Sequence, residues 1–163
     1  MSDLAKAFAA GTALAPDDLA GYVFAGVSLG MPRWFERATW KTFAKAFVRD
    51  GDLVRGWNYR VEQDGEGAPV RVRQRRGAPW AFGHFVVRPR GVGVELDFAP
   101  ERGPMAALRD EIVAMPDGRL IGRTLLAIAG RRVPTPSYFV LTRAAAVQHV
   151  VPSLTSRRHV AGG

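Results

Sequence analysis

The chain has 163 residues, no cysteine, and a formal net charge of +8 from 23 lysines and arginines against 15 aspartates and glutamates. The lack of cysteine excludes disulfides, thiolate metal sites and cysteine nucleophiles, and it fits a reducing compartment, so we expect a cytoplasmic protein. The length suits one domain with a substantial core, and no apolar run approaches the roughly 20 residues of a membrane-spanning helix.

The positive charge alone does not indicate a nucleic-acid partner. The basic clusters at residues 71–76, 131–132 and 157–158 are far apart in the sequence. No recognition helix or RNA-binding motif surrounds them, and charge without a reading element gives only nonspecific attraction. The sequence therefore does not favour nucleic-acid binding.

The first 18 residues predict a short helix and a turn-like connection. Ser2 is a good helix cap, alanines follow it, and Gly11 and Pro16 mark the exit and the turn. Residues 5–15 also loosely resemble a secretion signal, but Asp3 stands where such signals carry positive charge and the apolar part is mostly alanine. A capped helix is the favoured interpretation.

Residues 19–143 predict about nine short strands, because apolar and polar side chains alternate between turn-forming glycines, prolines and aspartates. The expected strands are residues 21–29, 40–48, 53–63, 70–75, 82–88, 92–98, 109–114, 120–128 and 137–142. Residues 99–104 and 130–136 are expected loops, and residues 33–39 an irregular or helical segment packed over an apolar surface. The tail, residues 144–163, is a possible helix with a disordered end.

No helices intervene that could make parallel crossovers, so the strands should form an antiparallel meander. Most strands have one apolar face and one face of mixed polar and aromatic groups, which favours closure into a barrel with a lined interior. We therefore predict a mainly β protein with a single antiparallel up-and-down barrel of about eight or nine strands. One domain should span residues 1–163, with the barrel at 19–143.

The two ends of the strand series carry a recognisable pattern. The first strand begins Leu-Ala-Gly-Tyr-Val at residues 19–23, and the last ends Phe-Val-Leu-Thr-Arg at 139–143. These ends resemble the lipocalin and fatty-acid-binding superfamily, in which a Gly-x-Trp element packs beneath an arginine of the last strand. The resemblance implies these roles for Gly21 and Arg143. Val23 departs from the pattern, with Tyr22 and Phe24 as the nearest aromatic side chains, so the likeness covers barrel closure and not the ligand.

The segment Trp57, Asn58, Tyr59 and Arg60 is the most unusual in composition. Alternation places the two aromatic side chains on one strand face and the amide and guanidinium on the other. An inward aromatic face would line an apolar cavity, with the tyrosine hydroxyl orienting a ligand. The alternative is that both rings only fill the core.

Two further positions are candidates for proton transfer. Phe82 and His84 should share a strand face, and an inward His84 would suit general acid or base chemistry, although an ordinary hydrogen-bonded core histidine is the favoured interpretation. Tyr138 enters its strand directly after a stiff Pro-Thr-Pro approach at 134–136. Its alternative role is an aromatic plug at the barrel end.

Glu95 and Asp97 share a face and are either solvent-exposed or a buried acidic pair. An interior Arg60 or Arg123 could pair with Asp97 and hold a ligand carboxylate. The three histidines, His84, His149 and His159, lack metal-ligand spacing, and no phosphate loop or nucleophile elbow is present. We therefore expect neither a metal nor a cofactor.

Three functions remain open at this point. The leading hypothesis is a barrel that binds a hydrophobic or amphipathic small molecule. The runner-up is a cofactor-free isomerase or cyclase of a biosynthetic pathway, in which His84 or Tyr138 moves a proton. The third is a partner-binding domain with a filled barrel, and a homodimer is compatible with all three. The expected ligand-binding residues are Trp57, Asn58, Tyr59, Arg60, Phe82, His84, Asp97, Arg123 and Tyr138.

Overall fold

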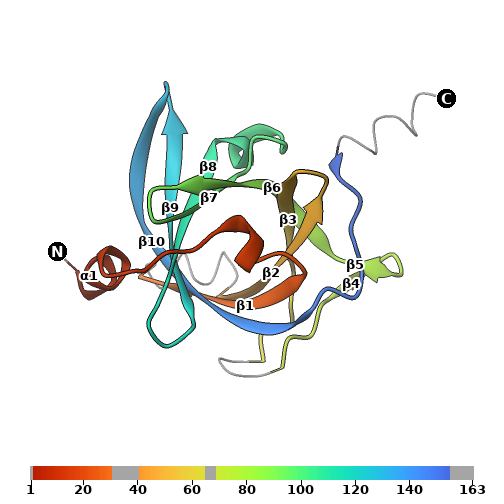
Figure 1. Cartoon of the computed structure of the whole chain (residues 1–163). Helices are drawn as coiled ribbons and strands as arrows, with labels where there is room; N and C mark the ends of the chain where they lie inside the picture. Colours follow the sequence, from red (N-terminus) through yellow and green to blue (C-terminus); the bar gives the residue numbers. More distant parts are fainter. Residues whose placement is uncertain (1, 31–40, 65–68, 155–163) are drawn as a thin grey trace.

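Eight antiparallel strands close into a barrel in the computed structural model, which describes residues 2–30, 41–64 and 69–154 (Figure 1). Each strand pairs with the next barrel strand in the chain, and the last pairs with the first. The barrel strands are β1 (Tyr22–Leu29), β2 (Thr42–Asp50), β3 (Leu53–Tyr59), β6 (Ala81–Arg90), β7 (Gly93–Asp97), β8 (Leu108–Ala114), β9 (Leu120–Ile128) and β10 (Arg131–Ala146). The predicted antiparallel up-and-down barrel is confirmed.

The N-terminal helix is also confirmed. Helix α1 (Asp3–Ala9) is capped by the Ser2 hydroxyl, which accepts a hydrogen bond of 3.2 Å from the Ala5 backbone N–H. None of the described helices is long and apolar enough to cross a membrane. The connection to β1 contains the short 3₁₀ helix η1 (Pro16–Asp18), where the Asp18 carboxylate accepts from the Ala15 N–H at 2.8 Å.

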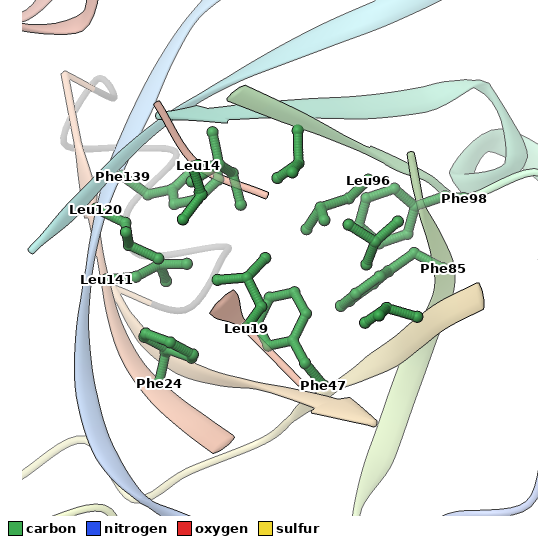
Figure 2. Close-up of a cluster of buried hydrophobic side chains, with 14 residues drawn as sticks. Leu14, Leu19, Phe24, Phe47, Phe85, Leu96, Phe98, Leu120, Phe139 and Leu141 are labelled. Carbon is green, nitrogen blue, oxygen red and sulfur yellow. The ribbon is translucent and has the colours of Figure 1, made fainter. Parts of the chain in front are cut away.

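This connection fills one end of the barrel. Leu14 and Leu19 flank η1, and Leu19 is fully buried. Figure 2 shows both side chains among the core residues inside the ring of strands, with Phe24, Phe47 and Leu141 close by. Apolar side chains from the connection therefore close the core at this end.

The predicted strand at residues 70–75 does not enter the barrel. It contributes a bridge between Val72 and Val61 and the short strand β4 (Gln74–Arg75), which pairs with β5 (Ala78–Pro79) in a separate two-stranded sheet. The barrel has no place for this segment because β3 pairs directly with β6 and leaves no edge between them, and the eight strands agree with the predicted eight or nine.

The last strand is longer than its sequence pattern indicates. β10 begins at Arg131, although residues 130–136 were expected to be a loop, and it continues to Ala146, past the point where a helix was expected. Pro134 pairs with Leu125 just before a shift in register, a position where the missing proline N–H is tolerated. Residues 147–153 are not helical, and η2 (Gly103–Ala107) lies partly in the expected loop at 99–104. The predicted segment at 33–39 and the end of the tail lie outside the described residues.

Three inward phenylalanine rings lie across glycines of the neighbouring strand. Gly26 is opposite Phe43, Gly56 is near Phe85, and Gly122 is opposite Phe139. A Cβ atom at any of these glycines would overlap the ring. The glycines therefore give the rings the space to extend across the barrel wall, and these rings help to form the site described below.

The Gly122→Ala variant is expected to lower the free energy of unfolding by about 1–3 kcal/mol, because the added methyl group overpacks the wall against the Phe139 ring. Urea denaturation followed by circular dichroism would measure the change. Adding Phe139→Leu should recover part of the loss, since the smaller side chain gives room for the methyl group. A Gly122→Ala protein as stable as the wild type would contradict this packing.

Candidate functional site

A cavity of about 190 Å³ occupies the end of the barrel opposite Leu14 and Leu19. It lies where β1, β3 and β7 end and where β2, β6 and β8 begin. Half of the described lining residues are aromatic or aliphatic and half carry polar groups, although the surface that they expose to the cavity is mostly apolar. Among the described residues, the lining is Ser28, Phe43, Lys45, Asn58, Phe82, Phe98, Met105, Leu108, Asp110, Thr124, Ser137 and Phe139. The interior is therefore filled at one end and hollow at the other.

A buried ion pair stands in the wall of this cavity. The Lys45 ammonium donates to Asp110 Oδ2 at 3.1 Å and to Asn58 Oδ1 at 2.8 Å, and the two charged side chains are only 5% and 8% exposed. The Thr124 hydroxyl donates to Asp110 Oδ1 at 2.8 Å, and the Asn58 amide donates to the Gly83 carbonyl at 3.2 Å. Strands β2, β3, β8 and β9 thus contribute to one hydrogen-bonded cluster.

Four phenylalanine rings surround the ammonium group. The centroids of the Phe43, Phe85, Phe98 and Phe139 rings lie 5.3 to 5.4 Å from Lys45 Nζ. At this distance the electron-rich faces of aromatic rings attract a cation. Figure 2 shows three of these rings, those of Phe85, Phe98 and Phe139, within the barrel core. The cross-strand glycines described above make room for three of the four.

Such a cluster is difficult to explain by stability alone. Removing two charges from water carries a desolvation cost that often exceeds their mutual attraction, and apolar residues of similar volume are often as stabilising. Lysine and aspartate are rarely fully buried unless they are paired, as Lys45 and Asp110 are. Since this pair faces a cavity, the cluster of Lys45, Asn58, Asp110 and Thr124 is the candidate functional site.

The side chains of β3 alternate between the two faces as predicted, but the aromatic side chains Trp57 and Tyr59 point out of the barrel. Asn58 lines the cavity, whereas Trp57 and Tyr59 lie in a second apolar cluster on the outer face, packed with Ala46 and with Val151 of the tail. Burial raises the pKa of Tyr59, and its hydroxyl donates to the His149 carbonyl at 3.3 Å. The two rings therefore fill an apolar core between the barrel wall and the tail and do not line the cavity.

His84 does not share a face with Phe82. The register shifts between Gly56 and Asn58 where they pair with β6, and Gly83 has a φ of +59°. This bulge breaks the alternation, so Phe82 and Phe85 both face the interior. His84 instead lines an outer hollow, and its backbone N–H donates to the Glu101 carboxylate at 2.6 Å.

Tyr138 likewise lies on the opposite face from the cavity. Its neighbours Ser137 and Phe139 both line the cavity, and the side chain between them in an extended strand must point outward. Neither residue expected to transfer protons is therefore in the cavity wall. The bulge at Gly83 and the strand phase of β10 account for the difference.

Asp97, Glu95 and Arg123 form ion pairs on the outer face of the barrel and not inside it. Asp97 pairs with Arg109 at 3.1 Å and with Arg88 at 3.5 Å, while Arg123 pairs with Glu111 at 2.6 Å. Glu95 accepts two hydrogen bonds from Arg132, at 2.6 and 2.9 Å. Arg60 stacks on the Trp80 ring, 4.6 Å from its centroid. The expected pairing of Asp97 with Arg60 or Arg123 does not form, and no arginine lines the cavity among the described residues.

Residues at the start of the first barrel strand and near the end of the last barrel strand lie in contact. The Arg143 guanidinium carbon lies 4.0 Å from the Tyr22 ring centroid, and its Nη2 donates to the Asp18 carbonyl at 3.4 Å. Gly21, with a φ of +89°, precedes the strand. Tyr22 thus stands where the pattern has its tryptophan, one position earlier in the chain.

Sequence reasoning did not single out Lys45, Asp110 or Thr124. A signal was present, since Lys45 lies between Phe43 and Phe47 in the apolar phase of its strand. Asp110 holds the same kind of position, two residues before the buried Ile112. Within the described ranges, His, Cys, Asp and Glu side chains form no group of three that could hold a metal ion.

No protein-family model matches the sequence, and no curated protein matches it. Among solved structures, one similar fold is the ileal bile acid-binding protein of zebrafish, crystallised with cholic acid. The match has a TM-score of 0.36 and 11% sequence identity, and it covers 77% of this chain and 98% of that one. At this identity the likeness concerns the barrel fold alone.

Proposed function

We propose that the protein binds a small, largely apolar molecule in the barrel cavity, with a polar group of the ligand directed at the Lys45 and Asp110 cluster. The observation that carries this proposal is the pairing of an aromatic-walled cavity with one buried polar cluster in its wall. Binding sites for small molecules combine apolar walls with a few placed polar groups in the same way.

The volume of the cavity limits the size of the ligand. A dry protein cavity of about 150 Å³ accepts benzene, whereas sites for drug-sized ligands span roughly 300–1,000 Å³. At about 190 Å³, this cavity suits one ring with a small substituent. A steroid or a long-chain fatty acid would extend beyond it.

The Ser28→Phe variant is expected to weaken binding by at least about 10-fold, because the new phenyl ring would occupy the space of a one-ring ligand. A cavity of about 150 Å³ holds a single benzene ring, so this cavity has no room for two. The measurement is a nuclear magnetic resonance titration of one-ring aromatic compounds, read at the side-chain amide of Asn58. Val27→Phe is the matched control, since it adds the same ring on the opposite face of β1 and should leave binding unchanged. Wild-type protein that binds no one-ring compound would contradict the proposal.

A second candidate is a cofactor-free isomerase or cyclase in the same cavity. It is favoured by a carboxylate and an ammonium 3.1 Å apart that both line the cavity, a base and an acid for moving one proton. With a substrate identified from a co-purified ligand or from neighbouring genes, Asp110→Asn should lower turnover by about 100-fold or more. Turnover that survives this change would contradict the enzyme hypothesis.

A further inference from the structure

The described lining of the cavity carries no net charge. Lys45 and Asp110 are the only charged side chains that line it among the described residues, and they neutralise each other at 3.1 Å. The arginines that could have held an anionic ligand lie on the outer face, where Arg123 and Arg132 are already paired with Glu111 and Glu95. The described lining therefore offers no unpaired cation to which an anionic ligand could bind.

An anionic ligand would be costly in this cavity. A carboxylate beside Lys45 would be a second negative charge next to Asp110, with one ammonium to share between them. Buried charges without full compensation are strongly disfavoured, because the interior replaces little of the hydration they lose. The charge balance of the site thus opposes carboxylate ligands.

The hydrogen-bond inventory points to a different ligand group. A lysine ammonium has three N–H donors, and the described residues give Lys45 two acceptors, Asn58 Oδ1 and Asp110 Oδ2. The third N–H of the Lys45 ammonium is left to donate to an acceptor atom of a ligand in the cavity. An uncharged oxygen, such as that of a ketone, ester or lactone, would accept it without adding charge.

Resting on the proposed function, we infer that the cavity binds uncharged one-ring compounds that carry a carbonyl oxygen and that it rejects the corresponding carboxylates. Lys45 is the specificity-determining donor, and Asp110 holds the ammonium in place and sets the net charge to zero. Thr124 and Asn58 keep the two ions oriented through their own hydrogen bonds.

Three probes of matched size test this inference by calorimetric or resonance titration at pH 7: acetophenone, ethylbenzene and benzoate. For the wild type, acetophenone should bind about 10-fold more tightly than ethylbenzene, the difference that one hydrogen bond from a charged donor makes. Benzoate, which is ionised at this pH, should bind at least about 100-fold more weakly than acetophenone.

Asp110→Asn should reverse the selectivity for charge. This nearly isosteric change leaves Lys45 as an uncompensated cation, so benzoate should gain at least about 10-fold in affinity through a charge-assisted hydrogen bond. Glu111→Gln is the matched control, because it removes a carboxylate from the next residue of β8, which faces the outer network. Its probe affinities should equal those of the wild type.

The possible results separate the two proposals. Wild-type protein that prefers acetophenone, with benzoate gaining in Asp110→Asn, supports the inference. Benzoate bound as tightly as acetophenone by the wild type overturns the inference and leaves the proposed function standing, whereas failure of all three probes to bind contradicts the proposed function itself. If Asp110→Asn does not fold, as circular dichroism would show, the wild-type ranking alone decides.

Discussion

The Lys45→Met variant is expected to lower the free energy of unfolding by about 3–5 kcal/mol, because Asp110 would remain in the interior without its partner. Methionine keeps the length of the side chain, so the loss reports the missing charge and not a void. Since native domains are stable by only about 5–15 kcal/mol, the variant should show a clearly lower urea midpoint.

The double variant Lys45→Met with Asp110→Leu separates the two contributions to this loss. Removing both charges together removes the desolvation cost as well as the attraction, and such apolar replacements are often neutral or stabilising. We therefore expect the double variant to recover most of the stability lost by Lys45→Met, and a double-mutant cycle would give the interaction free energy.

The exposed pair of Arg119 and Asp117 provides the comparison. Its atoms approach to 2.7 Å, but both side chains are about half exposed, and solvent screens such pairs. Arg119→Met should leave the urea midpoint unchanged within error. A Lys45→Met protein that behaved like Arg119→Met would contradict the burial of the charge pair.

These stability experiments also bear on the binding proposal. If the ion pair serves only as a fold-specifying feature, the double variant should fold and bind ethylbenzene and acetophenone with the wild-type difference in affinity. If Lys45 is the donor to the ligand, that difference of about 10-fold should disappear while ethylbenzene still binds. The double variant thus distinguishes a structural role from a binding role.

The barrel could be predicted from the sequence because alternation and turn chemistry are local. Gly51 and Gly91 illustrate this, since each lies in a hairpin turn with positive φ, +61° and +56°, the backbone region that glycine enters most easily. These turns set where strands end, and eight of the nine expected strands correspond to strands of the barrel. The pattern at the strand ends singled out Arg143, but it did not assign the ring of Tyr22 on which this arginine packs.

The site could not be predicted in the same way, for two physical reasons. First, the direction of a side chain depends on strand phase, and the single bulge at Gly83 sends Phe82 inward and His84 outward. Second, the outer face of β3 is buried as well as the inner one, because the tail residues Val147 and Val151 pack in the same cluster as Trp57 and Tyr59. The composition of the strand alone therefore does not tell whether the side chains of Trp57 and Tyr59 point into the barrel or away from it.

The ion pair itself depends on contacts that are distant in sequence. Lys45 and Asp110 are 65 residues apart, and neither strand considered alone indicates which residue would pair with its charge. Only closure of the barrel brings β2 and β8 to face each other across the interior. A charged residue in the apolar phase of a strand is the feature that should draw attention in such sequences.

The Leu19→Ala variant is expected to lower the free energy of unfolding by about 2–5 kcal/mol, because it opens a void in the filled end of the barrel. Leu19 is fully buried and lies among core side chains within the ring of strands (Figure 2). Urea denaturation would measure the loss. Leu53→Ala is the matched control, since the same atoms are removed from a side chain that is 44% exposed, and the change should stay within about 0.5 kcal/mol.

Binding measurements on Leu19→Ala test whether the filled end and the hollow end of the barrel are independent of each other. Leu19 does not line the native cavity, so under conditions where the variant is folded its affinity for acetophenone should equal that of the wild type. A new void lined by leucine and phenylalanine side chains would be apolar and could bind benzene independently. A stability loss no larger than that of Leu53→Ala would mean that the connection does not pack into the core. Loss of acetophenone binding by the folded variant would mean that the filled and hollow ends are not separate.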